Sequence, residues 1–288
     1  MILAKSNDFT MDTSIERIED ISEGTKFMSG PDVCFADTTV ALIVAYNGSS
    51  FSGFAKQPGQ STVQGEIEHA LSLIFRRDVS TICAGRTDSG VHAVGQVVSF
   101  DVECAELEQR SEANLLRSLN ALTAEGITIK QMDRKPFGFS ARFDAKARRY
   151  RYFFSTSVTP PLFMNDFSWH IGPLDVEAMQ AGADYLIGEH DFKSFCLAKS
   201  AIDKPTCRYI AEISFEKMNI FEDEILAMSI EGNAFLHSMV RTIAGSLVTI
   251  GKGKRASSWM SEVLNAQDRR AAGECAPAKG LVFWEVVY

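Results

Sequence analysis

The chain has 288 residues, a formal net charge of −8 at pH 7 and a hydrophobic fraction of 45%. Its length predicts one large or two medium-sized domains, and the lack of a long uncharged apolar run excludes an ordinary membrane-spanning helix. The acidic balance excludes a surface that binds nucleic acid indiscriminately, so any nucleic-acid site is expected to be local. The first residues lack the apolar segment of a secretory signal, and a cytoplasmic protein is therefore expected.

Residues 1–37 are polar and acidic and are predicted to form a flexible extension. The N-terminal domain is predicted over residues 38–136. Its strands are indicated by β-branched apolar runs that stop at turn residues, and its helices by apolar positions at helical spacing behind capping residues. The predicted order is a strand over 39–46, a helix over 62–77, strands over 78–84 and 94–101, a helix over 111–122 and a strand over 126–132.

The C-terminal domain is predicted over residues 137–288 and repeats this theme. The predicted order is a strand over 148–155, a helix over 175–187, paired strands over 209–216 and 224–231, a long apolar helix over 234–250, a short helix over 257–264 and a strand over 281–288. Strands joined by short turns as well as by helices predict an α+β fold. It consists of two α/β subdomains with mostly antiparallel sheets flanked by helices.

A polar loop bracketed by glycines carries the best candidate for chemistry. Asp88 lies at its turn between Gly85 and Gly90, which permit backbone conformations that other residues resist. A nucleophilic carboxylate must be ionised, and a nearby cation favours the ionised form. Arg86 would share a side with Asp88 along an extended backbone and could pair with it. On local pattern alone, a surface ion pair in a hairpin loop is the commoner explanation.

Basic residues concentrate between positions 130 and 151. They are Lys130, Arg134, Lys135, Arg142, Lys146, Arg148, Arg149 and Arg151. Because strands alternate faces, Tyr150 and Tyr152 are predicted to share one side and Arg149 and Arg151 the other. Such a strand would suit RNA, because a base could stack on a tyrosine while the cations hold the phosphate backbone. The alternative is a solvated basic face beside aromatic core residues.

Arg241 is predicted in the middle of the apolar helix 234–250, where a guanidinium needs a carboxylate partner. Asp88 is the candidate partner, and the alternative is an arginine that reaches solvent along its stem. His92 and His237 have no metal-ligand or triad companion at a recognisable spacing. Structural roles are therefore predicted for both.

The sequence Gly-Arg-Thr-Asp-Ser-Gly-Val-His-Ala at residues 85–93 resembles the signature loop of the tRNA pseudouridine synthase A family. Other stretches match in the family's order, at residues 46–54, 139–143, 148–152, 188–195 and 233–241. The resemblance covers nearly everything from about Thr38 to Tyr288. This chain departs from the family's usual residues at a few positions, which are Asn47, Phe54, Ala55, Ser89 and Ser238.

The resemblance implies the pseudouridine synthase fold around a central cleft. It also implies isomerisation of uridine to pseudouridine at positions 38 to 40 of the tRNA anticodon stem-loop, by a homodimer. Asp88 would be the nucleophile, Arg86 and Arg241 would keep it ionised, and Tyr150 would stack on the flipped uracil. Substrate contacts are expected at Tyr150 and at four basic residues, which are Arg142, Lys146, Arg149 and Arg151.

No cofactor or metal is expected, because the implied reaction needs no redox cofactor, metal or ATP. The sequence agrees with this expectation, because it has no dinucleotide-binding or P-loop motif. Its cysteines are scattered, with no C-x-x-C pair and no histidine nearby at a metal-ligand spacing. A same-family enzyme with another RNA target and a catalytically idle RNA-binding protein are the alternatives. A remote one is an aspartic protease, suggested by Asp88-Ser89-Gly90, but that chemistry needs two carboxylates that share a proton.

Overall fold

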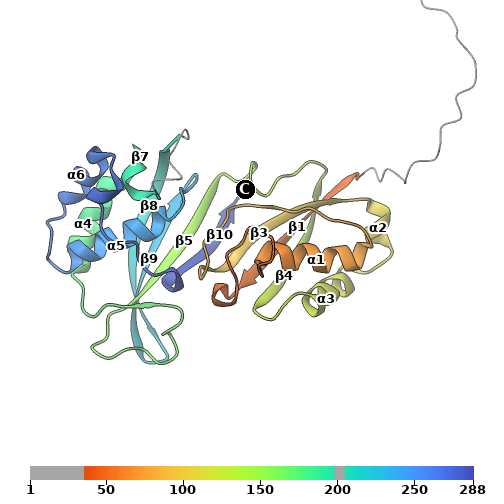
Figure 1. Ribbon diagram of the computed structural model, residues 1–288, viewed down its shortest axis with the longest axis horizontal. Coiled ribbons are helices and arrows are strands. Elements are labelled where there is room, and N and C mark those ends of the chain that lie inside the picture. The colour runs from red at the N-terminus through yellow and green to blue at the C-terminus, as the bar shows by residue number, and fades with distance from the viewer. Residues whose placement is uncertain (1–35, 198–204) are drawn as a thin grey trace, which may run out of the picture. The chain divides into compact units, whose positions relative to one another are not determined.

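A computed structural model describes residues 36–197 and 205–288 (Figure 1). The predicted extension over residues 1–37 lies outside these ranges except for its last two positions. Strands of the described chain form one mixed sheet. No helix within the described residues is both long enough and apolar enough to cross a membrane.

The elements follow the predicted order. The strands are β1 (Thr38–Tyr46), β2 (Ile82–Cys83), β3 (His92–Val102), β4 (Ile127–Pro136), β5 (Ala147–Ser155), β6 (Trp169–His170), β7 (Gly188–Asp191), β8 (Cys207–Ile220), β9 (Asp223–Gly232) and β10 (Leu281–Val287). The helices are α1 (Val63–Phe75), α2 (Cys104–Glu108), α3 (Glu112–Leu122), α4 (Val176–Ala183), α5 (Met239–Gly251) and α6 (Trp259–Ala266). The short elements α2, β6 and β7 were not predicted, and the strand expected over 78–84 is reduced to β2.

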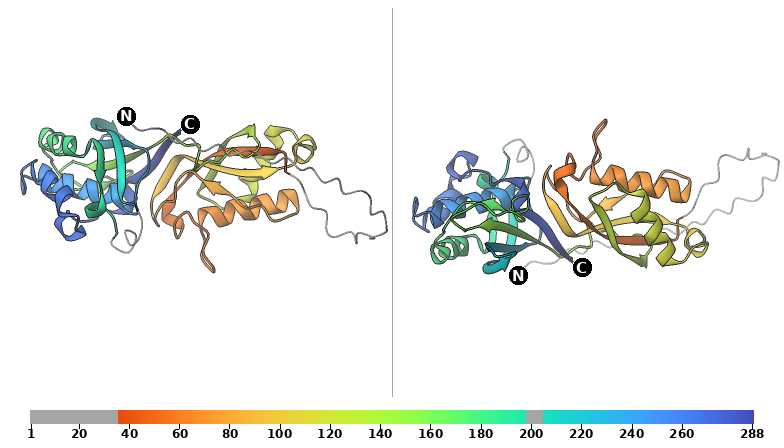
Figure 2. Two further views of the ribbon diagram at one scale, coloured as in Figure 1. Left: turned by 90° about the horizontal axis from the view of Figure 1, so that it is seen from above. Right: turned by 90° about the horizontal axis from the view of Figure 1, so that it is seen from below.

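The last strand of the chain, β10, joins the two halves into one sheet, whose main path runs β4-β1-β3-β10-β5-β9-β8-β7. It pairs in parallel with β3 and antiparallel with β5, and Figure 2 shows it from above and below between the strands of the two halves. Gly95 permits the close approach, because a Cβ there would lie 2.1 Å from the carbonyl oxygen of Trp284. The fold is α+β with mostly antiparallel pairing, as predicted. The division into domains at residue 136 stays a prediction.

The main hydrophobic core lies between the sheet and the helices, with α1 to α3 beside β1, β3 and β4 and with α4 to α6 beside β8 and β9 (Figure 1). The predicted apolar face of α1 is buried, at Val63, Ile67, Ala70, Leu71 and Ile74. On β5, Tyr150 and Tyr152 belong to this core, whereas Phe153 belongs to a small second cluster with Val282. The alternation predicted for β5 is therefore present.

Helix α5 begins at Met239 rather than at the predicted Ala234. The reason is Ser238, whose backbone has φ 60° and ψ 9°, the left-handed region that a right-handed helix cannot include. Arg241 consequently lies in the first turn of α5. The prediction that it lies in the middle of this helix is wrong. This turn faces the loop that carries Asp88.

Candidate active site

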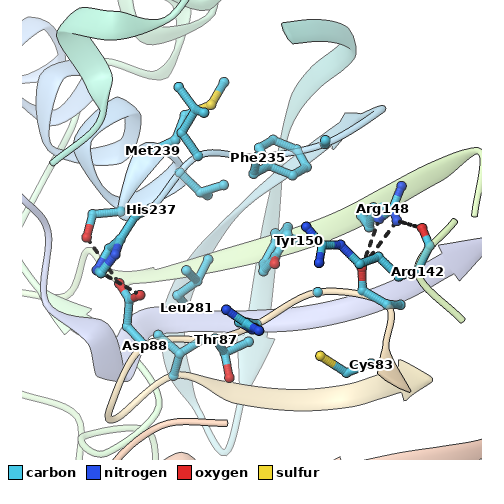
Figure 3. A pocket seen from close by; sticks show the side chains of 18 of the residues that line it. Cys83, Thr87, Asp88, Arg142, Arg148, Tyr150, Phe235, His237, Met239 and Leu281 are labelled. Atoms are coloured by element: carbon cyan, nitrogen blue, oxygen red, sulfur yellow. Dashed lines mark hydrogen bonds and ion pairs between the residues drawn. The ribbon is translucent and has the colours of Figure 1, made fainter. Parts of the chain in front are cut away.

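A cavity of about 580 Å³ opens where the Asp88 loop, β5 and the start of α5 meet (Figure 3). Three stretches supply most of its lining: residues 81–88, the segment 142–150 and residues 234–241. The predicted residues Asp88, Arg86, Arg241, Tyr150 and Arg142 all line it. The fold thus gathers at one place residues that are far apart in the sequence.

The loop before Asp88 is held from behind by buried polar groups. Gln96 on β3 donates its amide to the carbonyl oxygen of Gly85 at 2.6 Å. The Thr87 hydroxyl lies 2.8 Å from the hydroxyl of Tyr46 at the end of β1. Because Thr87, Gln96 and Tyr46 are all buried, these bonds are shielded from water and fix the position of Asp88 on rigid strands.

The two glycines that bracket Asp88 serve different purposes. Gly90 has φ +78°, a conformation that side chains disfavour. Gly85 is needed for space, because a Cβ there would lie 2.9 Å from the ring of Phe283. The sequence predicts an unusual backbone conformation at both glycines. A positive φ is present at Gly90 and not at Gly85.

The carboxylate of Asp88 is contacted by three side chains from one segment. Arg241 donates from Nη1 to Oδ2 at 3.0 Å, and the Ser238 hydroxyl donates to the same oxygen at 3.1 Å. The Nε2 atom of His237 lies 3.3 Å from Oδ1. The ion pair with Arg241 is only partly exposed, with 19% of the Arg241 side chain and 24% of the Asp88 side chain accessible. Its charges are thus partly shielded from water, which strengthens their attraction.

Arg86 does not make the local pair predicted for it. It is exposed on the rim of the cavity, and no ion pair joins it to Asp88 in the described part of the chain. The turn closed by the Val91 N–H and the Asp88 carbonyl oxygen, at 3.2 Å, begins at Asp88 and lies after residues 86–88. Arg241, which was also predicted as a partner of Asp88, is the arginine that pairs with it.

The two histidines differ from each other. His92 is buried and accepts at Nδ1 from the Gly48 N–H at 3.1 Å, and burial lowers its pKa, so it is a neutral structural residue. His237 was also predicted to be structural, but the structure places it against Asp88 on the cavity wall. The sequence held one indication of this position, because His237 lies in the stretch 233–241 that resembles the family and also contains Arg241.

Tyr150 forms the middle of the cavity wall, with Asp88 to one side of it and Arg148 to the other (Figure 3). Its ring packs edge-on against Phe235 and Phe283, at centroid distances of 5.1 and 4.7 Å. Burial raises the pKa of Tyr150 well above its usual range, and the nearby Asp88 charge adds to this. The hydroxyl therefore stays protonated at physiological pH.

The protonated state of Tyr150 predicts a flat pH profile in the alkaline range. We expect the single-turnover rate of the reaction proposed below to change less than about twofold between about pH 7.5 and 9.5, because a tyrosine with a raised pKa does not ionise there. The measurement is the rate at constant ionic strength, with Tyr150→Phe in parallel. A rise that follows one ionisation in this range, and that is lost in Tyr150→Phe, would show that the phenolate is the working form.

Arg148 closes the cavity on the side away from Asp88. Its guanidinium donates to backbone carbonyl oxygens of three separate segments: Ala84, Ala145 and Asn233, at 3.2, 2.9 and 2.7 Å. It also donates to the carbonyl of Arg142. Burial lowers the pKa of Arg148, but an arginine remains charged at neutral pH. This side chain ties the Asp88 loop to the approach of α5 and adds positive charge.

Arg149 and Arg151, predicted to contact substrate, do not line the cavity. Arg149 pairs with Glu231 and Glu285, both at 2.5 Å, and Arg151 lies 3.8 Å from Glu216. The physical reason is the alternation of β5, which turns both arginines to the sheet face opposite the cavity. Their charges are used in cross-strand ion pairs.

The cavity wall is strongly cationic. Among the described residues, its charged lining consists of one carboxylate, Asp88, and five arginines, which are Arg86, Arg142, Arg148, Arg208 and Arg241. Arg208 on β8 was not singled out from the sequence, and its Nε is buried without a hydrogen-bond partner among the described residues. Lys146, which was predicted, is exposed and does not line the cavity. A local positive site thus exists on a chain of net charge −8, and it suits an anionic ligand.

Comparison with known proteins identifies the family. A family model described as tRNA pseudouridine synthase matches residues 42–144 and 183–288. The chain belongs to this family. It is 43% identical to tRNA pseudouridine synthase A of Brevibacillus brevis over 247 residues, which is 85% of this chain and 98% of the relative. It is 40% identical to the Bacillus subtilis protein of that name over 248 residues, 85% of this chain and 97% of the relative. The Legionella pneumophila (strain Lens) protein of that name is 38% identical over 250 residues, 86% and 92% of the two chains.

The ranges matched to the tRNA pseudouridine synthase family contain both sides of the Asp88 cluster. Asp88 lies in the first range, and His237, Ser238 and Arg241 lie in the second. Tyr150 and Arg148 lie between the two ranges, on β5. The structure therefore links the two matched parts through β5, which carries the tyrosine and arginine of the cavity wall.

Proposed function

We propose that this member of the tRNA pseudouridine synthase family isomerises uridine to pseudouridine at positions 38 to 40 of the tRNA anticodon stem-loop, with Asp88 as the nucleophile. The observation that carries the proposal is the carboxylate of Asp88, held by Arg241 at 3.0 Å in an arginine-lined cavity beside Tyr150. The relatives named tRNA pseudouridine synthase A support the tRNA substrate.

The reaction is an isomerisation in which atoms balance within the nucleotide. The bond between uracil N1 and ribose C1′ breaks, a bond between C5 and C1′ forms, C5 loses a proton and N1 gains one. A carboxylate can start this by attack on C1′, by attack on C6 or by removal of a ribose proton. Each route needs an ionised Asp88, and the guanidinium of Arg241 supplies a counter-charge at 3.0 Å from its Oδ2.

Access to the reacting atoms requires the uridine to leave its stack. Extrusion of a base costs a few kcal/mol, which contacts to the flipped nucleotide and its phosphates must offset. The Tyr150 ring offers an aromatic surface for uracil, and two arginines of the cavity lining, Arg142 and Arg208, offer donors for phosphate oxygens. Arg148 contributes its positive charge alone, because its five N–H groups already donate to backbone carbonyl oxygens. Arg149 and Arg151 are left out of this assignment because carboxylates hold them on the other face.

We further propose that the enzyme acts in the cytoplasm as a homodimer. A stem-loop is larger than one cavity of about 580 Å³, so it must contact further protein surface. A second copy of this acidic chain would supply a second local cationic site for the same RNA. Sedimentation at micromolar concentration tests the dimer directly, and a monomer at all concentrations would contradict it.

Tritium release tests the reaction and its target together. Transcripts of tRNA labelled at C5 of uridine are incubated with the enzyme, and the uridines at positions 38, 39 and 40 are replaced in turn. We expect release from the unaltered transcript and loss of release when the target uridines are replaced. Release that persists after all three replacements would favour a family enzyme with another RNA target, and binding without release would favour an idle RNA-binding protein.

The aspartic-protease alternative receives no support from the site. It needs two carboxylates that share a proton. Among the described residues that line the cavity, Asp88 is the one carboxylate, and its contacts are the donors of Arg241 and Ser238 and the imidazole of His237. This described lining therefore has no second carboxylate with which Asp88 could share a proton.

A further inference from the structure

Ser238, immediately before α5, departs twice from the usual geometry of a residue that caps a helix. Capping residues normally have extended backbone and accept a hydrogen bond from the first turn of their own helix. Three other helices of this chain begin in that way, at Thr62, Ser111 and Asp175. Ser238 instead has φ 60°, and its side chain makes no capping bond. A serine in the left-handed region is held there against its own preference.

Both departures are explained by the direction of the hydroxyl. It donates to Oδ2 of Asp88 at 3.1 Å, across 150 positions of the sequence. The backbone turn that removes Ser238 from its own helix also aims it at the cavity, and Met239 and Val240 behind it are buried in the core. The strain is therefore located at a residue that contacts the proposed nucleophile, where strained backbone is often found.

The two oxygens of Asp88 consequently have different surroundings. Oδ2 accepts from Ser238 and from Arg241, at 3.1 and 3.0 Å, and two donors occupy its two lone pairs. Oδ1 has the imidazole of His237 at 3.3 Å, on a side chain that is 49% exposed and open to displacement. One donor alone would leave the carboxylate free to turn about its Cβ–Cγ bond, whereas two donors from different residues fix its plane.

We propose that Ser238 is a positioning residue, which together with Arg241 holds Oδ2 of Asp88 and leaves Oδ1 as the oxygen that reacts with the uridine. Ser238 acts through Asp88 and not on the RNA. The inference rests on the proposed function, since it concerns the reactivity of the same aspartate. It assigns to the hydroxyl a contribution to turnover and none to tRNA affinity.

Two substitutions separate the hydroxyl from the backbone strain. Ser238→Ala removes the hydroxyl and keeps the strain, whereas Ser238→Gly removes the hydroxyl and relieves the strain. Gln267→Gly is the matched control, because Gln267 also has a left-handed backbone, with φ 48°, but lies after α6 and outside the cavity lining. Single-turnover rate, KM for tRNA and melting temperature are measured for all three and for the wild type.

We expect both Ser238 variants to lose about 10-fold or more in single-turnover rate with KM within about twofold, the loss typical of one hydrogen bond to a charged group. Ser238→Gly should melt no lower than the wild type, and Gln267→Gly should keep wild-type turnover. A wild-type rate in either Ser238 variant, or a loss confined to KM, would overturn the inference alone. Absence of pseudouridine formation by the wild type on any tRNA would overturn the proposed function, and the inference with it.

Discussion

Replacement of Asp88 by alanine is expected to lower the rate of pseudouridine formation by at least about 10⁴-fold, because the proposed reaction then lacks the group that starts it. The affinity for tRNA should stay within a few-fold of the wild type. Most of the affinity is expected from contacts between cations and phosphates, and the five arginines of the cavity wall remain. Tritium release measures the rate, and filter binding at fixed salt measures the affinity.

Two further variants sharpen the Asp88 experiment. Asp88→Asn keeps the shape of the side chain and can still accept from Arg241, but it carries no charge, so the same loss of rate is expected. Asp133→Ala removes a half-buried carboxylate, paired with Lys135 at 3.8 Å on the far strand β4, and should leave the rate unchanged. Substantial turnover by Asp88→Ala would mean that another group starts the reaction.

The sequence was sufficient for those elements whose determinants are local. Helix α1 is specified by one apolar face and by the capping residue Thr62, whose side chain accepts from the Gly65 N–H. The position of β10 between β3 and β5 is not local. It depends on a parallel pairing between residues such as His92 and Val282, and no nearby residue of either strand specifies it.

The start of α5 shows why an apolar run can mislead. Residues 234–250 are mostly apolar and fit a helix throughout, but the helix cannot begin before the left-handed Ser238. The left-handed conformation of Ser238 accompanies its contact with Asp88, which lies 150 positions away. Nothing in the sequence next to Ser238 indicates that conformation. The difference matters for function, since it moves Arg241 from mid-helix to the turn that meets the Asp88 loop.

The cationic residues of the site were partly within reach of the sequence. The alternation of β5 separates Arg149 and Arg151 from Tyr150, and the same alternation assigns Arg148 to the face of Tyr150, so Arg148 was the better candidate from the start. Arg208 lies on β8 and reaches the cavity only through tertiary structure. Both Arg86 and Arg241 were predicted to pair with Asp88, and the structure shows the ion pair with Arg241, a contact across 153 positions that local spacing does not determine.

Replacement of Arg241 by methionine is expected to lower both the rate and the stability. Without the guanidinium, Oδ2 of Asp88 loses its charged partner at 3.0 Å, and the rate should fall by about 10² to 10³-fold. The same side chain donates from Nε to the carbonyl oxygen of Ala276 at 2.8 Å, and Ala276 N–H donates back to the Arg241 carbonyl oxygen at 3.1 Å. Loss of the side-chain contacts at a partly exposed site should cost about 2 kcal/mol of unfolding free energy, less than for a fully buried pair.

Matched variants separate these two roles of Arg241. Arg241→Lys keeps a positive charge near Asp88 but not the fork that also reaches Ala276, so we expect it to keep more of the rate than Arg241→Met while it loses similar stability. Arg270→Met breaks an ion pair with Asp268 at 2.7 Å whose arginine is 90% exposed, and it should leave the stability close to that of the wild type. In an Asp88→Asn background, Arg241→Met should destabilise the protein less, because the two residues interact. Equal rates for the lysine and methionine variants would show that charge is not what Arg241 contributes, and that its contact with Ala276 shapes the site instead.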